Sequence, residues 1–262
     1  MTIKGRFLFL GSGGSMGVPV IGCDCAVCRS TNPHNNRLRA AALVNVNDRN
    51  ILIDCGPDFR QQALRYGITD LDGTIITHAH HDHTASIDEL RIFYLRTKRA
   101  MPCLMSKATA EDLIPRYRYI FHPDDERKSV VTKIQLQLLE GERGEIDFQG
   151  VIMGYVTYEQ KGMEVNGFII GDLAYISDIR HYPESIFEDL QGVETLVISA
   201  LRFTQSDFHL TVDEAVEFID KVGAKKGYLT HIAHELEHEK TNAYLPEHVR
   251  VAYDGLELTF NY

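Results

Sequence analysis

Short apolar segments alternate with turn-forming residues along most of this chain of 262 residues. The segments are rich in Val, Ile and Phe, a composition typical of β-strands that pack against a core. We therefore predict twelve strands. They cover residues 7–10, 41–46, 51–53, 74–76, 134–139, 151–156, 168–170, 174–176, 196–198, 228–230, 249–252 and 256–260.

Between these strands, apolar positions recur at helical spacing. Thr211 and Glu214 form a capping box, which predicts a helix that begins at Val212. The predicted helices cover residues 59–66, 87–96, 108–120, 184–190 and 212–222. So many strands among fewer helices do not fit a strict βα barrel, and adjacent strands near 39–53 and 149–176 favour antiparallel ribbons. We predict an α/β protein, with two mixed β-sheets packed together and helices outside, in a single domain over residues 1–262.

The composition is that of an ordinary globular protein, with 44% hydrophobic and 24% charged residues. The net charge of −10 argues against a general nucleic-acid binder, which needs a basic face to neutralise phosphates. No apolar run reaches the roughly 20 residues that cross a bilayer. The apolar stretch at residues 7–10 is shorter than the about 7–15 residues of a signal peptide core, so we expect a first strand there. We expect a cytoplasmic protein with no membrane or nucleic-acid partner, and a homodimer is left open.

A dense group of metal-ligand residue types follows the predicted strand 74–76. His78, His80, Asp82 and His83 have the spacing H-x-H-x-D-H. In an extended turn His78 and His80 point to the same side, so they can share one metal. Asp82 and His83 then face a second metal, and His81 is expected to turn away. Two metals about 3.5–4 Å apart can generate a hydroxide at neutral pH. This run predicts a hydrolytic metal centre.

A second group of ligands has the pattern C-x-C-x₂-C, formed by Cys23, Cys25 and Cys28. Clustered cysteines in a protein that is not secreted indicate a metal rather than disulfides. Three thiolates leave one position of a tetrahedral zinc open, and His234 is the natural fourth ligand. A closed site of this kind is structural, because no position remains for water or substrate.

Together with the glycine-rich segment GSGGSMGVP at residues 11–19 and the motif Thr-His-x-x-His, these runs resemble the metallo-β-lactamase superfamily. The chain is most similar to the PhnP-like branch, which contains phosphoribosyl cyclic phosphodiesterases. The resemblance implies a four-layer αββα sandwich with the metals at one edge of the sheets. It also implies a structural zinc and two active-site divalent metals, manganese or zinc.

The resemblance assigns roles by position. His78 and His80 match ligands of the first metal, and Asp82 and His83 match ligands of the second. Asp178 matches a carboxylate that bridges the two. The remaining matches are His231 as the last histidine ligand, His209 as a catalytic acid or phosphate contact, and Cys23, Cys25, Cys28 and His234 as the structural zinc site.

The sequence departs from the family pattern at one ligand. The family supplies a further first-metal histidine before the bridging aspartate, yet no histidine stands between His122 and His181. Tyr158 lies near the expected place. The candidates for this position are Tyr158, Glu159, Gln160 or a water.

Two other motifs are rejected. A dinucleotide fingerprint from Gly11 requires glycine at position 16, where Met16 stands. The run from His234 to His238 is a literal H-E-x-x-H, the zinc-protease motif, but it would leave the histidine run and the cysteines unexplained. We expect Glu235 and His238 to be solvated.

The expected reaction is hydrolysis of a small phosphodiester or cyclic phosphate by a metal-bound hydroxide. Asp82 and Asp178 would orient the water. His209 would stabilise the phosphoryl charge or protonate the leaving group. The alternatives are a non-hydrolytic metal-binding module, a thioester or other ester hydrolase, and an RNA-processing nuclease of the same superfamily.

Overall fold

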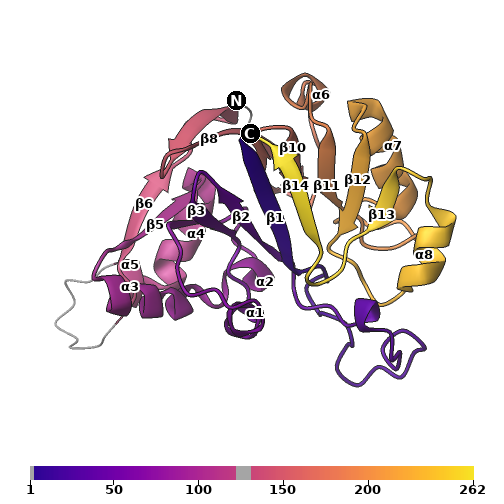
Figure 1. Cartoon of the computed structure of the whole chain (residues 1–262), viewed down its shortest axis with the longest axis horizontal. Coiled ribbons are helices and arrows are strands. Elements are labelled where there is room, and N and C mark those ends of the chain that lie inside the picture. The colour runs from indigo at the N-terminus through magenta and orange to yellow at the C-terminus, as the bar shows by residue number, and fades with distance from the viewer. Residues whose placement is uncertain (1–2, 122–130) are drawn as a thin grey trace.

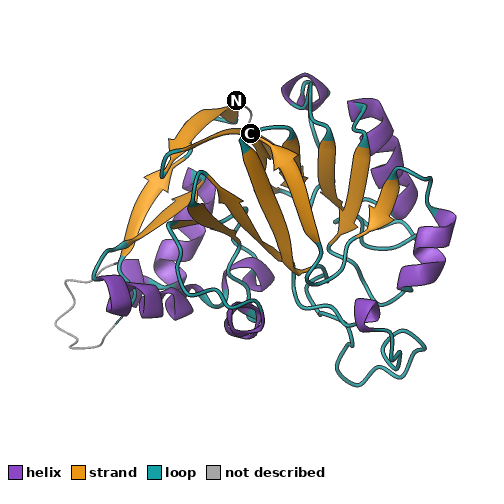
Figure 2. Ribbon diagram, in the orientation of Figure 1, coloured by secondary structure: helices purple, strands orange, loops and turns teal. Residues whose placement is uncertain are grey.

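The computed structural model describes residues 3–121 and 131–262. Two seven-stranded sheets lie face to face with helices on their outer sides (Figure 1; Figure 2). The first sheet has the strand order β14-β1-β2-β3-β4-β5-β6, and the second has the order β13-β12-β11-β10-β9-β8-β7. Each combines parallel and antiparallel pairs, so both sheets are mixed.

The strands of the first sheet are β1 (Lys4–Gly11), β2 (Ala41–Val46), β3 (Arg49–Ile53), β4 (Gly73–Ile75), β5 (Met101–Met105), β6 (Ile134–Leu138) and β14 (Glu257–Asn261). Those of the second are β7 (Arg143–Phe148), β8 (Val151–Gln160), β9 (Met163–Ile170), β10 (Leu173–Ile176), β11 (Thr195–Ser199), β12 (Lys226–Thr230) and β13 (Val249–Val251). The helices are α1 (Phe59–Arg65), α2 (His81–Thr84), α3 (Arg91–Thr97), α4 (Lys107–Arg116), α5 (Arg118–Phe121), α6 (Ile186–Asp189), α7 (Val212–Val222) and α8 (His238–Tyr244), with 3₁₀ turns η1 (Pro33–Asn35) and η2 (Ile87–Leu90).

Three layers of apolar side chains join these elements. The middle layer packs the two sheets together and includes Phe7, Phe168 and Tyr175. A second layer seals α1, α3 and α4 against the first sheet, and a third seals α6 and α7 against the second. This arrangement confirms the predicted αββα sandwich. In the described part of the chain, no helix is both long and apolar enough to cross a membrane.

The predicted elements hold in outline, but β5, an inner strand of the first sheet, was not among the predicted strands. The capping box at Thr211 is present, and α7 begins at Val212 as expected. Strand β7 was not predicted, because its sequence is mostly polar and exposed. It forms the edge of its sheet and, among the described strands, pairs only with β8. The predicted helix 87–96 is divided into η2 and α3.

Candidate metal centre and active site

The candidate site lies where several strands end. His78 and His80 follow β4, Asp178 follows β10, and His231 follows β12. Strands β3, β4 and β5 run parallel, as do β10, β11 and β12, so the loops after each set emerge together. Ligands of mixed α/β sheets bind at such carboxyl edges.

The first cluster consists of His78, His80 and Asp178, whose ligand atoms all lie within 4.8 Å of one another. His78 Nε2 is 2.9 Å from His80 Nδ1 and 3.6 Å from Asp178 Oδ2. His78 is fully buried, and its Nδ1 contacts the Thr77 hydroxyl at 3.0 Å, which fixes the ring. The two imidazoles therefore present one nitrogen each to a common point beside the carboxylate.

The second cluster joins Asp82, His83, Asp178 and His231 within the same 4.8 Å limit. His83 Nε2 is 3.4 Å from Asp82 Oδ2 and 3.6 Å from Asp178 Oδ2. His231 Nε2 lies 3.4 Å from carboxylate oxygens of both Asp82 and Asp178. Asp178 is thus shared by the two clusters, at the position that a bridging carboxylate would occupy. His81 belongs to neither cluster, although it lines the pocket above them.

The chemistry of these donors fits divalent cations. His83 Nε2 is buried without a hydrogen-bond partner among the described residues, so an atom suited to a metal points into the cluster. Burial alone would raise the pKa of Asp178, but the imidazoles of His231 and His83 outweigh it and hold this pKa well below its usual range. Asp178 is accordingly an ionised carboxylate. Buried charge of this kind is normally paired or bound to a metal.

Asp54 is a site residue that the sequence analysis missed. Its Oδ2 lies 2.6 Å from His83 Nδ1, and its Oδ1 accepts a hydrogen bond from the Thr77 amide at 2.8 Å. A carboxylate behind a ligand histidine fixes the ring tautomer and makes the other nitrogen a better ligand. The available signal was an aspartate directly after the buried strand at residues 51–53.

Several residues of the candidate site have strained backbone conformations. Asp54, Asp178 and His231 have φ angles of 65°, 54° and 57°, in the left-handed region that non-glycine residues rarely adopt. Such conformations persist where the surrounding structure holds them, and they concentrate at functional sites. Three of them lie at the same end of the sandwich, Asp54 after a strand of the first sheet and the other two after strands of the second, which supports a functional site there.

The four predicted structural-zinc ligands also come together. The sulfur atoms of Cys23, Cys25 and Cys28 lie 3.3, 3.6 and 3.4 Å from His234 Nδ1. A tetrahedral zinc, with sulfur at about 2.3 Å and nitrogen at about 2.0 Å, would separate these atoms by about 3.5 Å. The spacing therefore fits one zinc-sized ion. The three cysteines lie on the loop between β1 and β2, and His234 lies between β12 and α8, so this group is separate from the two clusters.

Comparisons with known proteins agree with this geometry. Residues 49–232 match the family model described as a beta-lactamase superfamily domain. A crystal structure described as a new diphosphatase from the PhnP family superposes with a TM-score of 0.91. It is 36% identical and covers 100% of this chain and 99% of that one. The chain belongs to the metallo-β-lactamase superfamily and is PhnP-like.

Two further relatives are more distant or only partly covered. The octanoyltransferase of Porphyromonas gingivalis is 32% identical over 257 residues, which is 96% of this chain but 51% of that protein. This chain thus spans about half the length of that curated relative. Human tRNase Z, short form, shares the fold at 16% identity, with a TM-score of 0.67 and coverage of 97% and 98%. The predicted class, a metal-dependent hydrolase of the metallo-β-lactamase superfamily, is confirmed.

The departure from the metallo-β-lactamase ligand pattern centres on Gln160. Its side chain is buried, and Nε2 donates to Asp178 Oδ2 at 3.2 Å. Its Oε1 is buried and finds no hydrogen-bond partner among the described residues. Tyr158 instead donates to the Ser177 carbonyl, and the Glu159 carboxylate accepts from the Gly162 amide. Of the three candidates, only Gln160 reaches the cluster.

His209 lies beside the second cluster of this PhnP-like site. Its ring stacks on His231 with centroids 4.7 Å apart, and Gln160 Nε2 is 3.1 Å from its Nε2. Burial lowers the pKa of His209 to about 4, so the imidazole is neutral near pH 7. His209 and the candidate ligands Asp82, Asp178 and His231 line a pocket of about 460 Å³.

The structure also agrees with the rejection of the dinucleotide fingerprint and of the zinc-protease motif. The chain after β1 forms no helix before η1, and a Cβ on Gly14 would lie 3.3 Å from His231 Nδ1. The glycines thus admit close packing against the metal site. His238 begins α8, so His234 lies outside that helix. The expectation that His238 is solvated is wrong, because it is buried between Arg37 and Asn242, whereas Glu235 is exposed.

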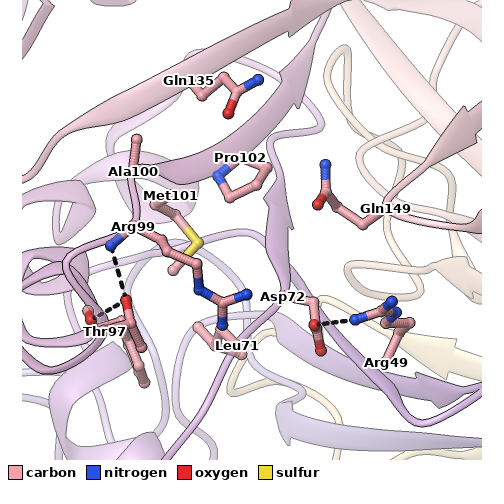
Figure 3. Close-up of a pocket in the computed structure, with 11 residues that line it drawn as sticks. Arg49, Leu71, Asp72, Thr97, Arg99, Ala100, Met101, Pro102, Gln135 and Gln149 are labelled. Carbon is pink, nitrogen blue, oxygen red and sulfur yellow. Dashed lines mark hydrogen bonds and ion pairs between the residues drawn. The ribbon is translucent and has the colours of Figure 1, made fainter.

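A second pocket, of about 470 Å³, lies at the other end of the first sheet (Figure 3). It is lined by Arg49 at the start of β3, by Asp72 just before β4, and by Met101 at the start of β5. Arg49 and Asp72 form an ion pair at 2.9 Å there. None of the clusters that could hold a metal contributes to it, so the carboxyl edge remains the candidate active site.

Proposed function

We propose that this chain hydrolyses a small phosphodiester or cyclic phosphate. The observation that carries the proposal is the pair of clusters that share Asp178 on the wall of a pocket of about 460 Å³. Two divalent metals, manganese or zinc, would supply a nucleophile at neutral pH and stabilise the charge on the attacked phosphoryl group. His78, His80 and Asp178 would hold one metal, and the second cluster would hold the other.

Three residues of the chain would act on the reacting groups. The carboxylates of Asp82 and Asp178 orient the attacking water, because both lie on the pocket wall and accept hydrogen bonds. His209 would contact the phosphoryl oxygens, because an imidazole that is neutral near pH 7 can donate a hydrogen bond to them but is a poor proton donor to the leaving oxygen. Its burial next to His231 and its contact with Gln160 hold the ring in place.

We assign structural zinc to the group formed by Cys23, Cys25, Cys28 and His234. Four protein ligands close the tetrahedron, so no position remains for a substrate. The ion would hold the segment between β1 and β2 against the Thr230–His234 turn, next to the active site.

The pocket volume of about 460 Å³ and the net charge of the chain favour a small substrate. The net charge of −10 opposes binding of a long RNA, although ribonuclease Z of Clostridium botulinum matches 22% of the chain. An acyl group is the substrate suggested by the name octanoyltransferase, and an acyl thioester is therefore included as a test substrate.

The test is turnover combined with metal analysis. We expect about three metals per chain, one at the cysteine group and two at the clusters. We also expect hydrolysis of bis(p-nitrophenyl) phosphate and of a nucleoside 2′,3′-cyclic phosphate with manganese or zinc. An octanoyl thioester and a precursor tRNA should react far more slowly. Faster cleavage of the thioester or the tRNA would overturn the proposal. One zinc per chain and no turnover would identify a non-hydrolytic metal-binding module.

Replacing Gln160 by histidine should shift the metal preference of the first cluster from manganese toward zinc. An amide oxygen suits a harder cation, whereas imidazole favours zinc. We expect zinc affinity to rise by about tenfold, which is at the low end of the 10–100-fold that changes around a metal ligand produce. Calorimetric titration of the metal-free protein measures this. Gln135→His, on an exposed position of β6, is the matched control. Equal zinc affinity in the parent and Gln160→His would show that position 160 does not face the metal.

A further inference from the structure

One wall of the pocket has no role in the reaction proposed above. This wall comes from the segment between β11 and α7 and carries Leu201, Arg202, Ser206 and Phe208. None of these residues belongs to either cluster. The wall therefore faces the substrate without holding a metal.

Arg202 is a cation whose hydrogen-bond donors are not all paired. Its Nη1 lies 3.4 Å from Glu235 Oε1, in a pair whose side chains are 36% and 45% exposed. A pair this exposed contributes little. Its Nε is buried and has no hydrogen-bond partner within the described part of the chain. A buried donor left unpaired costs free energy, and an anionic ligand would satisfy it.

Phe208 offers an aromatic face. Its side chain is 45% exposed although it lines the pocket. The Lys161 ammonium lies 4.4 Å from the ring centroid and 3.9 Å from the Asp207 carboxylate, so the turn between β8 and β9 steadies the ring. An exposed, steadied aromatic ring on a pocket wall is suited to stacking on a planar group of the ligand.

We propose that the substrate is a nucleotide that carries two phosphoryl groups. Its planar base stacks on Phe208, and its second phosphoryl group binds Arg202 while the scissile one lies at the clusters. This inference rests on the proposed function, because it uses the same metal-dependent attack on phosphorus, and it extends that attack from phosphate esters to the phosphoanhydride bond of the nucleotide. The pocket volume of about 460 Å³ is in the usual range for small-ligand sites.

The reaction on such a substrate balances without a further reagent. The water oxygen bonds to one phosphorus as the bridging P–O bond breaks. The departing phosphate keeps the bonding electron pair and takes up a proton derived from the water. The products are a nucleoside monophosphate and inorganic phosphate.

The test measures KM of two variants for each of three probes. ADP has a base and two phosphoryl groups, adenosine 2′,3′-cyclic phosphate has a base and one, and inorganic diphosphate has two and no base. Arg202→Gln should raise KM by about tenfold for ADP and diphosphate and leave the cyclic phosphate within threefold. Phe208→Leu should raise KM by about tenfold for ADP and the cyclic phosphate and leave diphosphate within threefold.

The matched controls are Arg143→Gln, which lies in the exposed pair with Asp189, and Phe203→Leu, whose ring is 42% exposed and packs on Tyr244. Neither lines the pocket, and both should behave as the parent. If each variant changes KM equally for all three probes, or changes KM for none of them, the inference is overturned. If the parent turns over no probe, the proposed function fails. Calorimetric binding of ADP to the metal-free protein then decides the inference: both variants should bind about tenfold more weakly, and unchanged affinity would refute it.

Discussion

We expect the Asp178→Asn variant to lose about three orders of magnitude in kcat/KM and to bind only one of its two active-site metals tightly. Asp178 is the residue shared by both clusters, and its oxygens lie 3.4–3.6 Å from ring nitrogens of His78, His83 and His231. An amide keeps the shape of the side chain but removes the negative charge between two cations. Metals supply several kcal/mol of transition-state stabilisation, and about 4 kcal/mol corresponds to a thousandfold in rate.

The measurement is steady-state hydrolysis of bis(p-nitrophenyl) phosphate together with metal analysis of the purified variant. Asp220→Asn is the matched control. Asp220 lies near the end of α7, and its exposed carboxylate pairs with His248. It should keep both the metals and the rate. A variant at position 178 that retains two active-site metals and loses less than tenfold in rate would show that Asp178 does not bridge them.

The sequence predicts those parts of the site whose ligands are close together along the chain. His78, His80, Asp82 and His83 are brought together by the end of β4 and the short helix α2 that follows it. The cysteine group is similar, because a C-x-C-x₂-C loop can wrap an ion without help from the rest of the fold. Only His234 had to be supplied by a distant segment, and its spacing from His231 indicated it.

Contacts that depend on how the two sheets meet could not be predicted in this way. Strand alternation places Tyr158 and Gln160 on one face and Glu159 on the other, but it does not say which of the first two reaches Asp178. The choice depends on where β8 ends relative to β10. Asp54 was missed for the same reason, because its partner His83 comes from α2, which follows another strand.

The side chains of the pocket wall could not be predicted from the sequence either. Arg202 and Phe208 stand in a loop with no recognisable motif. Their role becomes visible only when the turn at Lys161 and the carboxylate of Glu235 are seen beside them. Short motifs thus identify the metal chemistry of this chain, whereas the fold determines which substrate reaches it.

The largest expected effect on stability is that of Cys25→Ser. Its sulfur lies 3.6 Å from His234 Nδ1, and hydrogen bonds centred on the Cys28 amide outweigh desolvation and lower the pKa of its thiol to about 6. A thiolate available at neutral pH suits zinc binding. Loss of one of four ligands should release about one zinc per chain. At a free zinc concentration of about 1,000 times Kd, the bound ion stabilises the fold by about 4 kcal/mol, or roughly 10 °C in Tm for a chain of this size.

Differential scanning fluorimetry, with and without a chelator, measures this effect alongside zinc analysis. Because the cysteine group lies apart from the two clusters, kcat at a temperature well below the lowered Tm should stay within threefold of the parent. Cys103→Ala is the matched control, since Cys103 is fully buried among apolar side chains and belongs to no ligand group. It should lower Tm through lost packing but keep all three metals and show the same response to the chelator as the parent. If Cys25→Ser retains its zinc and its Tm, the assignment of a structural zinc at this group is wrong.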